Sequence, residues 1–274
     1  MNMIADLPLY FRCCGTPESA IDSPWYSWCV KKGSPPAPER ERFFACLVAS
    51  AIANGTDSRE ELRLLCREQG MTEAEEAHLF HPWGGVIAEL AQMGVIVFKV
   101  QEEKAYRLCP PFAPMSAHAA ELELARRYFT HYGPATLRDA AYFFHATQSQ
   151  VKQWLKELPV QSLTLDGMTY FHISCPLPDG DIPRCLLLAG FDQLLLGCRK
   201  EDNPFLPQEY LRGIFNLAGI VAPGILLDGR IVGKWKQKDG RLSLTLFESL
   251  SADRKRDILT KAESLWPIRR VEWL

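Results

Sequence analysis

The sequence predicts an α+β fold in which modules of helix, turn, helix and hairpin occur in tandem, followed by a small β-barrel-like domain. The clearest observation lies in residues 132–170, where a Gly133-Pro134 break, two short helices and two strand-like runs follow one another. The runs meet at Asp166-Gly167, and such a pair between strand-like runs is a strong hairpin signal. A helix–turn–helix closed by a hairpin is the winged-helix pattern, whose second helix suits a DNA major groove. The same order of elements recurs upstream, which indicates a repeated module.

Composition excludes several classes of protein. At 274 residues, 47% hydrophobic and 23% charged, the chain can bury two or three small cores. No apolar run reaches the roughly 20 residues of a membrane helix, and the first residues lack the basic and apolar regions of a signal peptide. Nine scattered cysteines without a Cys-x-x-Cys pair argue against a disulfide framework and a zinc site. We therefore expect a cytoplasmic protein with no metal, no cofactor and no membrane contact.

The net charge of −2 conceals an asymmetry along the chain. Residues 230–274 contain 11 basic and 6 acidic side chains, a net charge of +5, so the remainder carries −7. Such asymmetry suggests that one face meets polyanions. A solvated basic C-terminal helix would give the same numbers, and that alternative stays open.

The first complete module is predicted over residues 35–112, after a remnant of an earlier module and a linker in residues 1–34. A helix opens at Glu39 and runs to about Asn54, with apolar residues at helical spacing. Thr56 or Asp57 is expected to cap a second helix that ends near Gln69, with Glu60 placed for a capping box. After an acidic turn, a third helix follows residues 81–85 and ends near Met93. Residues 95–100 and 105–109 then form a hairpin.

The second module is predicted over residues 113–176. Its helices are expected at 116–132, 136–145 and 147–158, and its hairpin at 161–165 and 168–173. The two third helices share an apolar pattern at an offset of 65 positions: Val86, Leu90 and Met93 against Val151, Leu155 and Leu158.

Residues 177–274 are predicted to form the barrel-like domain with one helix. Strands are expected at 186–188, 194–196, 220–227, 230–236 and 242–247, with two-residue turns at Asp228-Gly229 and Asp239-Gly240. A helix at 252–266 and a last strand at 269–274 complete the domain.

The helix at 147–158 is the first candidate DNA contact. If Val151, Trp154, Leu155 and Leu158 face inward, the outward and flanking positions are Ser149, Gln150, Lys152, Gln153 and Lys156. A glutamine amide can bond an adenine edge, and lysines can bind phosphate or guanine. An ordinary solvated helix face is the alternative.

A second candidate contact surrounds the Asp239-Gly240 turn, where the basic residues are Arg230, Lys234, Lys236, Lys238 and Arg241. Strand alternation places Lys234, Lys236 and Lys238 on one face and Trp235 on the other. This ridge could contact phosphates, or it could protect an edge strand with lysine. The two hairpin turns, at 101–104 and 165–168, carry too few basic residues to be expected in a minor groove.

Candidates for catalysis are sparse. The histidines show no metal-site pattern, and His78 and His81 are expected at the surface or at a helix end. Asp192, in an otherwise apolar stretch, is a weak catalytic candidate. Arg199, seven residues on, would be its partner in a structural ion pair or would line a DNA cleft.

Four strings together resemble a known family: ARRYFTHYGPATLRDAAYFF, PWGG, LLLAGFDQLLLGCRKEDNPFLP and GILLDGRIVGKWK. They look like winged-helix proteins related to crosslink-repair (AlkZ-like) DNA glycosylases, over most of residues 35–250. The resemblance implies three tandem winged helices and a β-barrel that form a positively charged cleft around duplex DNA. It also implies cleavage of the N-glycosidic bond of alkylated or crosslinked purines.

The sequence departs from this family at the catalytic signature, Gln–apolar–Gln or Gln–apolar–Asp in the first module. Residues 1–34 contain no glutamine, and Gln148-Ser149-Gln150 lies in the last winged helix with a polar middle residue. We therefore expect a protein that binds duplex DNA without the usual catalytic motif. An active glycosylase and a winged-helix protein-interaction module are the alternatives.

Overall fold

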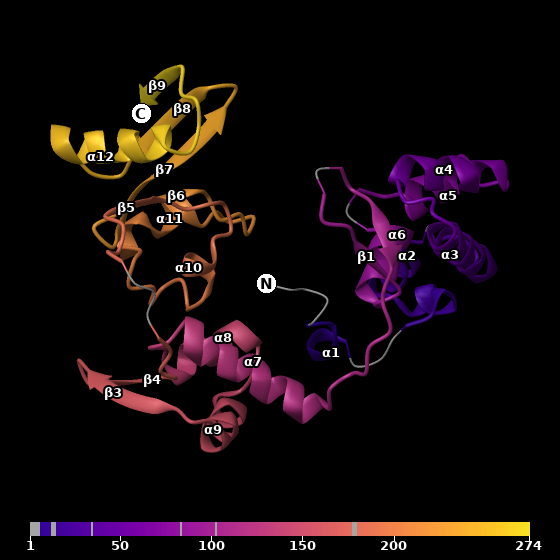
Figure 1. The fold of residues 1–274 in the computed structure, drawn as a ribbon, viewed down its shortest axis with the longest axis horizontal. Helices are drawn as coiled ribbons and strands as arrows, with labels where there is room; N and C mark the ends of the chain where they lie inside the picture. Colours follow the sequence, from indigo (N-terminus) through magenta and orange to yellow (C-terminus); the bar gives the residue numbers. More distant parts are fainter. Residues whose placement is uncertain (1–5, 12–14, 34, 83, 102, 177–179) are drawn as a thin grey trace. The chain divides into compact units, whose positions relative to one another are not determined.

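The computed structural model describes residues 6–11, 15–33, 35–82, 84–101, 103–176 and 180–274. Ser34 of the predicted linker, Trp83 of the PWGG string, Glu102 of the first hairpin turn and residues 177–179 lie outside the described residues. The chain divides into two compact units, Met1–Glu123 and Leu124–Leu274. Each combines helices with short strands (Figure 1), as the predicted α+β class requires. The division at 34, 112 and 176 remains a prediction.

The first unit is mainly helical. Its elements are α1 (Leu7–Tyr10), η1 (Pro17–Asp22), α2 (Pro24–Lys32), α3 (Pro38–Ala53), α4 (Arg59–Glu68), α5 (Glu73–Leu79), α6 (Val86–Gln92), β1 (Ile96–Phe98) and β2 (Tyr106–Leu108). The two strands pair antiparallel, in the predicted hairpin. Phe44, Val48 and Ile52 of α3 are buried at helical spacing and form the centre of the core.

Two predictions for this unit are wrong in detail. The cap of α4 is Ser58, whose hydroxyl accepts a hydrogen bond from the Glu61 amide at 3.2 Å. Asp57 cannot cap α4 because its carboxylate binds Lys99 and its carbonyl accepts from Tyr106. The acidic stretch after α4 is a helix, α5, which Thr72 and Glu75 begin with a capping box. Helix α2 was also not expected, although Ser23, Pro24 and Gly33 are ordinary signals for its ends.

A buried polar cluster lies under the first unit's helices. Glu41, Glu89 and Ser23 are almost fully buried, and the Ser23 hydroxyl, which also caps α2, donates to Glu89. His78 is buried too, with its Nε2 3.1 Å from a Glu41 carboxylate oxygen, so its predicted place at the surface is wrong. Burial, together with the negative charge of Glu41, raises the pKa of Glu89 to about 8.

The second unit begins within α7 (Ala117–His131), followed by α8 (Leu137–Phe144), α9 (Gln148–Glu157), β3 (Gln161–Leu165) and β4 (Met168–His172). All five elements lie where the sequence predicts them. The hairpin turn has positive φ at Asp166 (50°) and Gly167 (76°), as a two-residue turn of this kind needs. Capping boxes from Thr136 and Thr147 begin α8 and α9.

A five-stranded sheet follows, with the order β5 (Cys185–Leu187), β6 (Gly224–Leu227), β7 (Arg230–Lys238), β8 (Arg241–Leu246) and β9 (Arg270–Trp273). Neighbours pair antiparallel except β8 and β9, which are parallel. Among the described strands, β5 and β9 do not pair with each other, so the sheet stays open and a closed barrel is not confirmed. Helix α12 (Ala252–Glu263) lies beside this sheet (Figure 1). Its residues Ile258 and Ala262 are buried in the core of the sheet.

The segment between β5 and β6 contains short helices: α10 (Gln193–Leu196), η2 (Gln208–Tyr210) and α11 (Leu211–Ile214). A strand at 194–196 was therefore a wrong prediction. Asp192 accepts a hydrogen bond from the Leu194 amide at 2.9 Å and so begins a helical turn. The predicted strand at 220–227 is confirmed only from Gly224 onward. None of the described helices is long and apolar enough to cross a membrane.

The buried cluster predicts a pH dependence of stability. Between about 4.5 and about 8, folded Glu89 holds a proton that the unfolded chain releases. The free energy of unfolding should therefore fall as pH rises through this window, by at most roughly 1.4 kcal/mol per pH unit. In urea unfolding across this range, Glu89→Gln should flatten the slope, whereas Glu68→Gln, at an exposed site on α4, should leave it unchanged. Equal slopes for the native protein and Glu89→Gln would contradict the assignment.

Candidate nucleic-acid interface

Helix α9 presents the predicted polar face. Val151 and Trp154 are buried, and the Trp154 ring packs edge-on against Phe144 with centroids 5.3 Å apart. The outward positions are all exposed: Ser149, Gln150, Lys152, Gln153 and Lys156. The apolar face thus fixes the rotation of the helix, and the rotation leaves its amides and ammonium groups in solvent.

Some of these side chains already have local partners. The side-chain Oε1 of Gln150 accepts from the Thr147 backbone amide and hydroxyl, both at 2.9 Å, so Gln150 stabilises the start of the helix. The Lys156 ammonium donates to the side-chain Oε1 of Gln153 at 3.2 Å. Lys152 forms no ion pair with any described residue. Gln153, Lys152 and Lys156 are therefore the members of this face best placed to contact a ligand.

The sheet carries a second polar surface. Residues that lie directly opposite on neighbouring strands share a face, and the register aligns Lys238 with Arg241 and Arg241 with Arg270. Lys236 aligns with Ser243, which aligns with Glu272, and Lys234 aligns with Thr245. We call this surface the basic face and define it by its cations: Lys234, Lys236, Lys238, Arg241 and Arg270.

The other side of the same strands belongs to the core. The Trp235 ring packs on Trp266 with centroids 4.7 Å apart, and its indole N–H donates to the Leu188 carbonyl at 2.9 Å. Leu242 and Leu244 are fully buried on this side. Alternation along β7 thus separates lysine from tryptophan, as predicted.

The charge of the basic face is only partly neutralised. Glu272 is the carboxylate among the aligned residues, and it lies 3.1 Å from Arg270 and 3.9 Å from Arg241. Within the described part of the chain, Lys234, Lys236 and Lys238 form no ion pair. Cations directly opposite one another destabilise a sheet, so Lys238, Arg241 and Arg270 form an unfavourable group of like charges in the unliganded protein.

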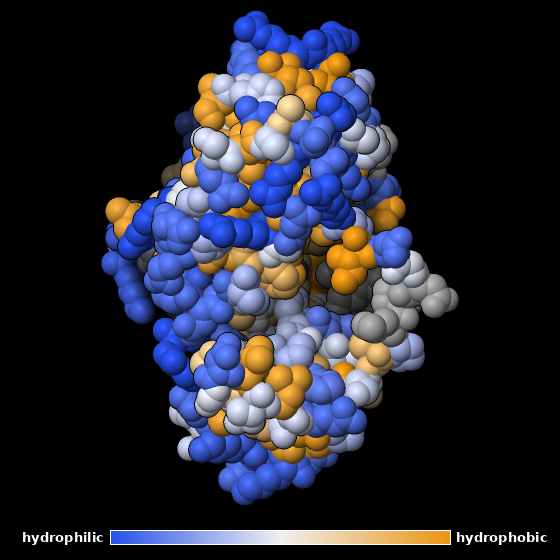
Figure 2. All heavy atoms as spheres, turned by 90° about the vertical axis from the view of Figure 1, so that its left-hand side faces the viewer, coloured by the Kyte–Doolittle hydropathy of each residue, from blue (hydrophilic) through white to orange (hydrophobic). Residues whose placement is uncertain are grey.

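Helix α12 does not account for the basic excess of the C-terminal segment. Arg254 binds Asp228 at 2.7 Å, and Arg256 binds Asp253 at 3.0 Å. Over the upper part of the face that Figure 2 draws, hydrophilic side chains are interspersed with hydrophobic ones. Since α12 contains four basic and three acidic residues, most of the excess lies on the strands of the sheet, where Arg270 adds to the lysines.

Two predicted contact residues lie apart from the basic face. Arg230, at the start of β7, lies 3.2 Å from Glu209 and 3.5 Å from Glu248, and its guanidinium sits over the Tyr210 ring. Arg199 pairs with Asp202 at 3.3 Å, and its backbone amide donates to Asp139 at 3.1 Å. No ion pair joins Arg199 to Asp192 in the described structure, so that prediction is wrong. Asp192 caps α10 instead.

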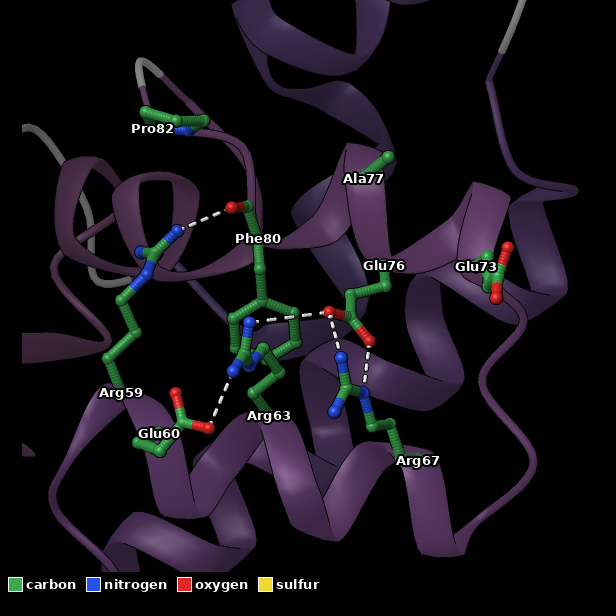
Figure 3. Close-up of a pocket in the computed structure, with 9 residues that line it drawn as sticks. All are labelled: Arg59, Glu60, Arg63, Arg67, Glu73, Glu76, Ala77, Phe80 and Pro82. Carbon is green, nitrogen blue, oxygen red and sulfur yellow. Dashed lines mark hydrogen bonds and ion pairs between the residues drawn. The ribbon is translucent and has the colours of Figure 1, made fainter.

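The first unit contains a pocket of about 550 Å³ between α4 and α5 (Figure 3), lined by Arg59, Glu60, Arg63, Arg67, Glu73, Glu76, Ala77, Phe80 and Pro82. Arg63 and Arg67 both bind Glu76, and Arg59 donates to the Phe80 carbonyl at 2.5 Å. Three guanidinium groups thus face three carboxylates. This balance does not favour a phosphate ligand over any other.

Sequence reasoning missed Arg270 and the tryptophan pair of α2. The sequence predicts Arg270 on a strand but not its position beside Arg241. That position follows from the parallel pairing of β9 with β8, which joins residues about 30 positions apart and has no local signal. The sequence did offer a signal for this helix: Ser23-Pro24 is a typical helix start, and Trp25, Tyr26 and Trp28 follow it.

These helices, hairpins and strands define a mixed helix-and-sheet protein. A family model of AlkZ-like DNA glycosylases matches residues 34–267. The chain therefore belongs to the AlkZ-like DNA glycosylase family.

A similar sequence and a similar solved structure both come from Streptomyces sahachiroi. A curated protein of Streptomyces sahachiroi, an interstrand DNA cross-link repair glycosylase, is 25% identical over 189 residues, which cover 63% of this chain and 51% of that protein. This chain thus spans about half the length of that relative. The solved structure of the Streptomyces sahachiroi DNA glycosylase AlkZ is similar, with a TM-score of 0.64 and 22% identity over 94% of this chain and 74% of that one. That likeness shows a shared fold.

The basic face predicts an unusual effect on stability. Lys238→Gln removes one of three directly aligned cations, so it should raise the free energy of unfolding by about 0.2–1 kcal/mol at low ionic strength, with a smaller gain in high salt. Arg230→Gln serves as the control because Arg230 has two acidic partners, and it should not stabilise the protein. Urea unfolding at two salt concentrations measures both. If Lys238→Gln instead lowered the free energy of unfolding, repulsion among Lys238, Arg241 and Arg270 would not be a significant cost to the sheet.

Proposed function

We propose that this chain binds duplex DNA through the outward face of α9 and the basic face of the C-terminal sheet. The single observation that carries the proposal is the alignment of five cations with one carboxylate on the solvent side of β7, β8 and β9. Neutralising phosphates releases counterions, which supplies most of the free energy of binding that does not depend on sequence. Membership of the AlkZ-like family supports a DNA ligand.

In this proposal, residues 35–112 and 113–176 are winged-helix modules and residues 177–274 are the sheet domain that carries the basic face. Helix α9 takes the place of the recognition helix, because it follows α8 after a short turn and precedes the β3–β4 hairpin. Gln153 would contact base edges in the major groove, and Lys152 and Lys156 would contact phosphates. One glutamine is too little for a sequence code, so we expect weak dependence on base sequence.

Arg199 and Arg230 have secondary roles in the proposal. Both guanidinium groups are engaged with carboxylates of their own unit. Each would have to exchange that partner for a phosphate, which reduces its net contribution to binding. The free lysines carry the larger share.

Catalysis is assigned to no residue. Hydrolysis of a glycosidic bond needs a polar group that holds the attacking water and stabilises a cationic sugar. The Gln–apolar–Gln signature is missing from residues 1–34, and the Asp192 carboxylate is engaged at the start of α10. We therefore propose binding without the usual catalytic motif.

An active glycosylase is the second candidate, and it is favoured by the similarity to the interstrand DNA cross-link repair glycosylase of Streptomyces sahachiroi. In that case Asp192 remains the weak candidate for the polar group that holds the attacking water. A protein-interaction module is the third candidate. It predicts that binding to DNA is absent or nearly independent of salt.

The phosphate contacts can be counted by their salt dependence. Replacing Lys236 and Lys238 together by glutamine should weaken binding of a fluorescent duplex and reduce the slope of log affinity against log salt by about 2, roughly one per lysine. The matched control is Arg230→Gln, which removes a cation that carboxylates already neutralise, and its slope should stay near that of the native protein. Unchanged slopes for the double variant would remove the basic face from the interface.

Activity is tested by incubating the purified chain with alkylated duplex and measuring released bases. The proposal expects no release above the spontaneous rate. If bases are released, Asp192→Asn tests the second candidate, because asparagine is an equally good helix cap and keeps the fold. Loss of release with intact DNA binding would assign Asp192, and unchanged release would exclude it.

A further inference from the structure

Helix α2 displays an aromatic pair that the DNA-binding surfaces described above do not use. The Trp28 side chain is 49% exposed, and its ring stacks on Trp25 with centroids 5.2 Å apart and planes inclined by 23°. Trp25 in turn lies 4.8 Å from the ring of His81. An aromatic stack therefore extends from the solvent toward the interior of the first unit.

Packing holds this stack in place. Trp25 lies directly against Gly84, where even a Cβ atom would come within 2.4 Å of the indole ring. The indole N–H of Trp25 has no acceptor among the described residues, so contact with its neighbours rather than a hydrogen bond orients the ring. Trp28 rests on this fixed ring.

The helix itself is anchored on its other side. Tyr26 and Cys29 are buried, and the Tyr26 hydroxyl donates to the Pro36 carbonyl at 3.0 Å. The Ser23 cap is bound to Glu89 in the buried cluster. A stacking surface held this firmly loses little conformational entropy when a ligand binds.

The surroundings of Trp28 are cationic. Lys31 and Lys32 are exposed at the end of α2, and the Lys32 ammonium lies 5.8 Å from the centre of the Trp28 ring. The nine residues of α2 include no acid. Burial raises the pKa of Tyr26, and the negative charges of Glu41, Glu39 and Glu89 raise it further while Arg42 lowers it, so carboxylates act on the Tyr26 hydroxyl on the buried side of α2.

An exposed aromatic ring beside lysines is the combination that binds unstacked nucleobases, because every base has a face that stacks and every nucleotide carries a phosphate. We propose that Trp28, supported by Trp25, stacks on an unpaired nucleobase of DNA while Lys31 and Lys32 contact the adjacent phosphates. This proposal rests on the proposed function and assigns to the first unit a preference for DNA with an unpaired base.

The test compares two duplexes of equal length, one fully paired and one with a single unpaired base. Stacking on an aromatic side chain corresponds to roughly 5- to 150-fold in affinity, so the second duplex should bind at least fivefold more tightly. Trp28→Ala should abolish this preference and leave the affinity for the paired duplex unchanged. Trp28→Tyr should retain most of it.

Phe98→Ala is the matched control, since Phe98 is a similarly exposed aromatic residue of the same unit, 52% exposed and packed on Tyr106. It should keep the preference. Urea unfolding of Trp28→Ala should still be a single cooperative transition with only a modest loss of stability, because half of the side chain is already in solvent.

Three outcomes would overturn the proposal: no preference for the unpaired base, equal losses for both duplexes in Trp28→Ala, or the same loss in Phe98→Ala. Each of these leaves duplex binding by α9 and the basic face intact. Failure of the native chain to bind either duplex would overturn the proposed function as well.

Discussion

The register of β7 against β8 and β9 is the constraint on which the C-terminal surface depends. Side chains alternate along a strand, so the pairing that buries Trp235, Leu242 and Leu244 also directs the lysines of β7 outward. A slip of one residue would place ammonium groups beside Trp266 under α12. Formation of the hydrophobic core therefore enforces the accumulation of like charge on the opposite face.

The same coupling of core and surface operates in the helices. In α9, Val151 and Trp154 set the rotation, and the capping box of Thr147 and Gln150 sets the first turn. Gln150 thus contributes to stability before any ligand is present, whereas Gln153 and Lys152 remain available. In the first unit, the Ser23 hydroxyl both begins α2 and binds Glu89, which links the placement of the tryptophan pair to a buried carboxyl group.

The surfaces proposed for DNA differ in chemistry. The basic face presents lysine and arginine side chains on a sheet. Helix α9 presents the Gln153 amide between Lys152 and Lys156, and α2 presents the exposed ring of Trp28. Phosphate contacts position a protein on DNA, whereas contacts with bases discriminate between ligands. If the proposals hold, a family member with these surfaces would select a structural feature of DNA even where no catalytic group is assigned.

The sequence by itself determined the helices and hairpins whose signals are local, such as the Asp166-Gly167 turn, the helix that opens at Thr147 and the alternation of Lys234 to Lys238. It did not determine the α10 turn, because Leu194–Leu196 is equally apolar as a strand and only the Asp192 cap decides between the two. Nor did it reveal the burial of His78 beside Glu41 or the partners of Arg199 and Arg230. Only the tertiary structure decided these contacts and the alignment of Arg270 with Arg241. The physical reason is that contacts between distant segments depend on the packing of the whole unit and not on neighbouring residues.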